Sequence, residues 1–291
     1  MLAFLSKISV TCFFASYFVV LVLELLRFFG KIPGRGLAVV VMMSLGLFTH
    51  VCYLVLRVVA RGGTSEIGLL ASWYDWSLLL ALGLAICFLS FYLRRPDTVI
   101  SLFFLPLILA TIGLSLAVQP MAPFSRSEAA EAWRSIHGLA MAVGAGGVLT
   151  GFLAGIMYLA QSWRLKNKRA GSSLRLPTLE TLARLNRQCL VVSTAAVTIG
   201  VLAGAIMNLN RWGQVGWTSG GVLFSFGLLV WLAVATCVEF FYAPASHGRK
   251  AFYLTLASLG FLVLALFGVL NSSHGRTIPT EQVSVISEDA A

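Results

Sequence analysis

Two of the four histidines stand at the ends of long apolar segments, where an imidazole can bind a metal ion. His137 occurs in Ile136-His137-Gly138, and His274 closes Asn271-Ser272-Ser273-His274. One imidazole on each side of a haem gives a six-coordinate iron, so the pair predicts axial haem ligands. Zinc suits these residues less, because no carboxylate or cysteine stands near enough in sequence to complete a tetrahedral set. The alternative is that each histidine is an ordinary hydrogen-bonding residue at a membrane boundary.

A short loop with two tryptophans, Arg211 to Thr218, connects two long apolar segments. Trp212 and Trp217 are unusual in a connection needed only for turning. Tryptophan favours the membrane–water boundary, because its ring is apolar and its N–H needs a polar partner. The loop is therefore either an interfacial anchor or a flat aromatic shelf for a planar ligand.

The other two histidines differ in their surroundings. His50 lies inside an apolar segment, where an ionisable group is expensive and is a functional candidate by default. It is either an intramembrane relay for a ligand or a neutral histidine satisfied by a neighbouring helix. His247 lies in a polar connection and is expected to be solvated. Glu24 stands one turn before Arg27, and a local ion pair accounts for it.

The composition excludes a soluble domain. Hydrophobic residues make up 58% of the 291 residues and charged residues only 11%, and the mean hydropathy is +0.89. An all-α, polytopic integral membrane bundle of about eight transmembrane helices is expected. The net charge of +10 lies in the connections between apolar segments, so it indicates topology and not nucleic-acid binding. The five cysteines lie within apolar segments and form no CxxC motif, which argues against thiol redox chemistry.

The apolar segments predict one transmembrane domain over residues 1–291 with a polar external tail at 276–291. The expected spans are 8–28, 37–60, 76–93, 99–118, 136–163, 188–208, 219–242 and 250–271. Basic residues cluster in alternate connections, above all in 164–187, and the positive-inside rule assigns these to the cytoplasm. Both termini, the tryptophan loop, His137 and His274 then lie on the external side, and the loop and the two histidines share one depth.

Three further segments are expected to serve structure alone. The basic connection 164–187 is predicted to be a solvated loop with a short amphipathic piece near Leu179–Leu185. Gly147, Gly151 and Gly155 form a strip spaced by four residues, which permits close contact between helices. The aromatic cluster Trp73–Trp76 is expected to anchor its helix at the membrane boundary.

Several of these motifs together resemble the cytochrome c assembly family, clearest over residues 130–275. That family includes haem-handling proteins of the CcsA, ResC and CcmC type and HemX-like proteins. The similar motifs are Ile136-His137-Gly138-Leu139, the Trp-Gly loop, Gly268-Val269-Leu270-Asn271 with His274, Leu182–Arg187 and Gly248–Ala251. The resemblance implies non-covalent haem b on Trp212 and Trp217, ligated by His137 and His274. It also implies a multi-pass protein of the bacterial cytoplasmic (inner) membrane, with apocytochrome c and another biogenesis membrane protein as partners.

The tryptophan segment departs from the family pattern of Trp-Gly, two residues, Trp, one residue, Trp-Asp. Here Trp212-Gly213 is followed by Gly216-Trp217-Thr218-Ser219, without the acidic residue and one tryptophan. The leading hypothesis is a haem holder that delivers haem to apocytochrome c. The alternative is a HemX-like regulatory or scaffolding protein with weak or no haem binding. A two-haem electron carrier would need a second histidine pair, and an enzyme acting alone would need a nucleophile, catalytic dyad or phosphate loop, none of which is visible.

Overall fold

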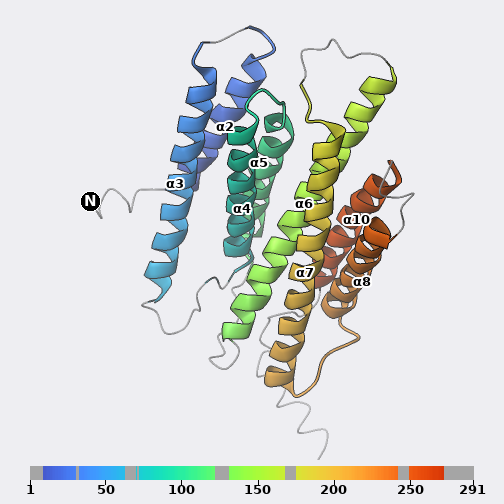
Figure 1. The fold of residues 1–291 in the computed structure, drawn as a ribbon. Helices are drawn as coiled ribbons and strands as arrows, with labels where there is room; N and C mark the ends of the chain where they lie inside the picture. The colour runs from blue at the N-terminus through green and yellow to red at the C-terminus, as the bar shows by residue number, and fades with distance from the viewer. Residues whose placement is uncertain are drawn as a thin grey trace, which may run out of the picture.

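The computed structural model describes residues 9–30, 33–62, 70, 72–121, 131–167, 175–241 and 249–271. Within these ranges the chain forms eight α-helices and no strand. They run alternately up and down as a single bundle (Figure 1). In chain order they are α2 Val10–Leu26, α3 Arg35–Gly62, α4 Trp73–Arg94, α5 Ser101–Val118, α6 Glu131–Lys166, α7 Leu179–Trp212, α8 Gly220–Phe241 and α10 Arg249–Asn271.

Seven of these helices are long and apolar enough to cross a membrane. The exception is α2, whose 17 described residues extend about 26 Å at 1.5 Å per residue. The polytopic helical bundle expected from the composition is therefore confirmed. His274, His247 and the tail 276–291 lie outside the described residues.

Helices α6 and α7 are longer than the apolar segments within them. They cover 36 and 34 residues, whereas hydropathy predicted 136–163 and 188–208. The amphipathic piece near Leu179–Leu185 is not a separate element of a loop, because it forms the first turns of α7. Thr178 caps that helix by accepting a hydrogen bond from the Thr181 backbone N–H. Polar residues can continue a helix beyond the hydrocarbon layer. Hydropathy alone therefore underestimates the length of such helices.

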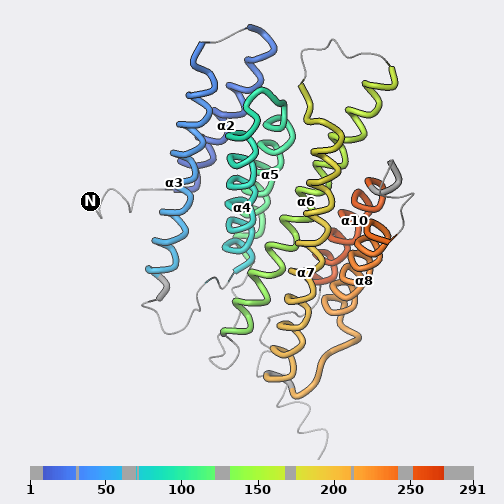
Figure 2. Tube along the Cα trace, in the orientation of Figure 1, coloured from blue at the N-terminus to red at the C-terminus, as the bar shows by residue number. Residues whose placement is uncertain are grey.

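The buried apolar side chains form two clusters that share α6. The first is built mainly from α2, α3, α4 and α5 and reaches α6 at Leu153 and Met157. The second joins α6 at Val148 to α7, α8 and α10. The glycine strip makes the close contacts predicted for it: a Cβ at Gly147 would stand 3.4 Å from the Cys189 carbonyl oxygen of α7, and Gly155 faces α10. Figure 2 shows α6 running between the two halves of the bundle.

The bundle has two chemically different ends. One, here called the His137 end, holds the starts of α4, α6 and α8 and the ends of α3, α5, α7 and α10 (Figure 1). The other, the arginine end, holds Arg27, Arg35, Arg94, Arg95, Arg184 and Arg187. The positive-inside rule predicts that the arginine end faces the cytoplasm.

A buried carboxylate ties four helices together at the arginine end. Glu24 of α2 is 1% exposed, pairs with Arg35 of α3, and accepts hydrogen bonds from Ser101 Oγ at 2.5 Å and Tyr92 Oη at 3.4 Å. The expected local pair with Arg27 is the weaker contact, at 3.9 Å. Arg27 instead donates to the backbone carbonyls of residues 97 and 98. The local ion pair expected for Glu24 is therefore present, and a second, closer cation comes from the next helix.

Candidate functional site at the His137 end

His137 lies in the second turn of α6 with its ring against α7. Its Nδ1 lies 2.7 Å from the carbonyl oxygen of Gly200. A carbonyl can only accept a hydrogen bond, so Nδ1 carries the proton and Nε2 carries the lone pair. This is the tautomer in which histidines bind metals, with the other ring nitrogen donating to a backbone carbonyl.

The ring of His137 occupies a notch formed by glycines of α7. A Cβ added at Gly204 would stand 2.9 Å from Nδ1 and 3.1 Å from Cε1, closer than real Cβ contacts allow. Gly200 supplies the carbonyl and Gly204 the space one turn later. Glycine at these positions thus brings the α7 backbone to the imidazole and holds the ring in one orientation.

An indole packs on α6 at Gly138, the residue after His137. Trp76 of α4 packs so closely over Gly138 that no side chain fits at that position. The sequence predicted only a membrane anchor for this tryptophan. Its contact with the residue after His137 joins it to the candidate site, and no local signal indicates a contact between residues so far apart in the chain.

The last turn of α10 reaches the level of His137. Gly151 of α6 faces Thr255 of α10, and the two helices run in opposite directions. His137 lies as many residues before Gly151 as Val269 lies after Thr255. Because both helices rise equally per residue, His137 and Val269 stand at the same level along the bundle. Gly220 at the start of α8 faces Gly268 in the same turn of α10. Four helices besides α6 thus meet at this level, α4, α7, α8 and α10, and His274 follows α10 in the sequence.

The tryptophan loop stands farther out than His137. Trp212 follows Gly204 by eight residues, so the end of α7 projects about 12 Å beyond the imidazole. The expectation that the loop and His137 share one depth was therefore wrong. The helix ends where Gly213 adopts φ 68° and donates its N–H to the Leu209 carbonyl. Trp217 is 64% exposed on this projecting loop, whereas the side chain of Trp212 lies outside the described residues.

The family model described as Cytochrome C assembly protein matches residues 70–275, well over half of the chain. The chain belongs to the cytochrome c assembly protein family. No curated protein matches it. Membership supports a role in cytochrome c biogenesis at a membrane. The match begins near the start of α4, well before residue 130, and therefore includes Trp76 with His137.

In this member of the family, His50 lies in the other half of the bundle. Its ring is fully buried in the first apolar cluster and stacks on Phe13 of α2 at 4.0 Å, with the ring planes 1° apart. Nδ1 lies 3.3 Å from the Tyr17 hydroxyl. The Leu78 backbone approaches the ring, but no partner among the described residues meets hydrogen-bond geometry at Nε2. Helix α2 therefore covers one face of the imidazole, and a ligand reaches this fully buried ring only if the surrounding helices move.

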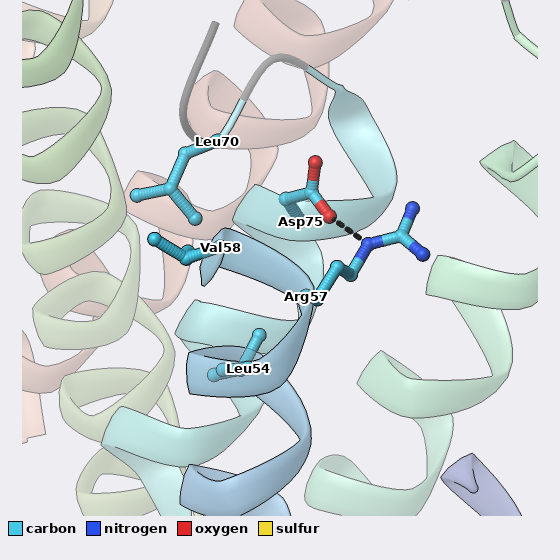
Figure 3. Close-up of a pocket in the computed structure, with 5 residues that line it drawn as sticks. All are labelled: Leu54, Arg57, Val58, Leu70 and Asp75. Carbon is cyan, nitrogen blue, oxygen red and sulfur yellow. Dashed lines mark hydrogen bonds and ion pairs between the residues drawn. The ribbon is translucent and has the colours of Figure 1, made fainter. Parts of the chain in front are cut away.

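A second polar cluster of this family member joins α3 to α4 at the His137 end. Arg57 Nε donates to Asp75 Oδ1 at 2.5 Å, as Figure 3 shows, and the carboxylate is almost completely buried. Ser72 Oγ donates to the other carboxylate oxygen at 2.6 Å. The guanidinium also lies 4.5 Å above the Tyr74 ring. These contacts fix the start of α4 and hence the helix that carries Trp76.

Proposed function

We propose that this protein holds haem b non-covalently at the His137 end and presents it on the external face of a bacterial cytoplasmic membrane. His137 and His274 are the axial ligands, and Trp212 and Trp217 stack on the porphyrin. The recipient is apocytochrome c, brought by another membrane protein of cytochrome c biogenesis.

The observation that carries this proposal is the hydrogen bond from His137 Nδ1 to the Gly200 carbonyl, 2.7 Å long. In the neutral ring it places the proton on Nδ1 and leaves Nε2 with the lone pair that would be donated to iron. It also holds the ring so that ligation does not need to order it. The same bond would serve a purely structural histidine, so the role of the ring is decided by measurement.

The end of α10 favours His274 as the second ligand. His274 is five residues beyond Val269, the residue of α10 that stands level with His137. Five residues of chain extend at most about 17 Å. A haem between the two imidazoles needs its second ligand within this reach. The projecting α7 and its exposed Trp217 add an apolar surface on the outer side of the same region.

The experiment is an absorption spectrum of the purified protein after loading with haem. The wild type should show the sharp low-spin bands of bis-histidine iron when reduced. His137→Ala and His274→Ala should each shift the iron toward high spin, and added imidazole should restore the low-spin bands. The double variant should lose most of the haem. His247→Ala is the matched control and should leave the spectrum unchanged.

Retention of the wild-type spectrum and haem content by the double variant would place the haem elsewhere. It would favour the second function, a HemX-like regulatory or scaffolding protein of the same fold. The observation that supports this alternative is the shortened tryptophan segment, which lacks the acidic residue and one indole. Failure of the wild-type protein to bind haem would also favour this alternative.

A further inference from the structure

A cavity of about 430 Å³ lies at the arginine end, far from His137 along the bundle. It is bounded by the end of α4, the start of α5, Met157 of α6 and the first turns of α7. Neither the haem proposal nor the family match assigns a role to it. Its lining divides into a basic part and an apolar part.

The basic part consists of Arg94 and Arg95 from α4 and Arg184 from α7. The acidic residue in the lining, Glu180, pairs with Arg184 at 3.4 Å. In the part of the chain that the structure describes, no ion pair joins Arg94 or Arg95 to an acidic residue. The lining therefore carries two positive charges without a paired anion, and the α7 N-terminus adds its partial positive charge.

The apolar part is continuous with the first hydrophobic cluster. Phe91 and Leu185 are half-buried in this lining, and they pack against the fully buried Phe104 and Met157 of that cluster. A site for a small dissolved anion needs no such wall. The combination fits a ligand with an anionic head and a hydrocarbon body, the head lying toward the arginines and the body toward Phe91 and Leu185.

We propose that this cavity binds an anionic phospholipid of the cytoplasmic leaflet, with its phosphate group on Arg94 and Arg95. Guanidinium groups match phosphate with paired hydrogen bonds, and basic pockets between transmembrane helices at the cytoplasmic side bind anionic headgroups. Thr178 and Thr181 line the same cavity and place hydroxyl groups beside the headgroup. The bound lipid would connect α4 to α7, and so the first half of the bundle to the second.

Native mass spectrometry of the full chain in neutral detergent tests this proposal. The probes are dioleoylphosphatidylglycerol and dioleoylphosphatidylcholine, which differ in headgroup and not in acyl chains. The wild type should retain phosphatidylglycerol preferentially. The double variant Arg94→Gln/Arg95→Gln should bind it about 30-fold more weakly, the effect of removing two basic residues near a headgroup.

The matched control is Lys166→Gln/Arg175→Gln, which removes two exposed charges from the same end outside the cavity lining. It should keep the preference. Thr181→Trp fills the cavity at constant charge and should abolish the preference, with size-exclusion elution confirming the fold. Equal losses in both double variants, or unchanged binding in Arg94→Gln/Arg95→Gln, would overturn the proposal.

Two competitors separate the sources of the anion. Inorganic phosphate should not displace phosphatidylglycerol, and displacement would reassign the cavity to free phosphate. Stoichiometric haemin should not displace it either, and displacement would reassign the arginines to haem propionates. His137→Ala should retain the lipid, so failure of the haem proposal and failure of this one give different results.

Discussion

Alanine at position 204 tests whether the glycine notch controls haem binding by His137. The new Cβ would stand 2.9 Å from Nδ1, whereas ordinary van der Waals contact begins at 3.4 Å. The ring must retreat by the difference, about 0.5 Å, which lengthens the 2.7 Å bond to the Gly200 carbonyl to about 3.2 Å. That distance is the upper end of the ordinary range for an N–H···O hydrogen bond, so the contact that orients the ring is weakened.

Loss of such a supporting contact weakens metal binding by about 10- to 100-fold. Titration of the purified protein with haemin, followed by absorbance, should show this increase in Kd and a shift toward high-spin iron. Gly227→Ala is the matched control, because a Cβ there meets nothing within 4 Å. Both variants gain roughly 0.5–1 kcal/mol of helix propensity, so their difference reports the contact alone. Equal haem affinity and equal spectra in the two variants would refute the reasoning.

Three further predictions concern other parts of the bundle. Glu24→Gln should lower the thermal unfolding temperature in detergent, because removing one partner of a buried pair costs about 3–5 kcal/mol. Adding Arg35→Gln should restore part of this loss of stability. A Glu24→Gln variant as stable as the wild type would contradict the buried pair. His50→Phe should keep the fold by preserving an aromatic ring in that place, so a loss of haem in a stable variant supports a relay, and unchanged haem removes His50 from the mechanism. On intact cells an impermeant thiol reagent should label Gln214→Cys and not Asn167→Cys, once the native cysteines are shown to be silent; the reverse pattern would invert the topology.

Much of the fold follows from hydropathy, because each helix that crosses a membrane needs a long apolar segment. The ends of α6 and α7 do not follow from it, since helices continue into water wherever capping and propensity allow. Thr178, with Glu180 in the first turn, is a recognisable start signal for α7. Hydropathy alone misses this helix start, because the turns that follow it are basic.

The candidate site could be predicted only in part. His137 is conspicuous as an imidazole at the end of an apolar segment, but its partners on α7 are glycines that carry no chemical signal. Trp76 has the same difficulty, because the packing of α4 on α6 is a tertiary event. Glu24 shows a related difficulty: the nearby Arg27 does pair with it, but the closer partner, Arg35, stands on another helix and has no local signal.

The two ion pairs of α3 have a mechanical consequence. Arg35 and Arg57 are 22 residues apart on one straight helix, about 33 Å along its axis, close to the roughly 30 Å thickness of a hydrocarbon layer. Each guanidinium is anchored by a carboxylate of a different neighbour, Glu24 of α2 and Asp75 of α4. Sliding α3 by one turn would break both pairs at once. The two pairs therefore fix the register of α3 against α2 and α4, so adaptation to a thinner membrane would involve tilting of these helices together or adjustment of the lipid.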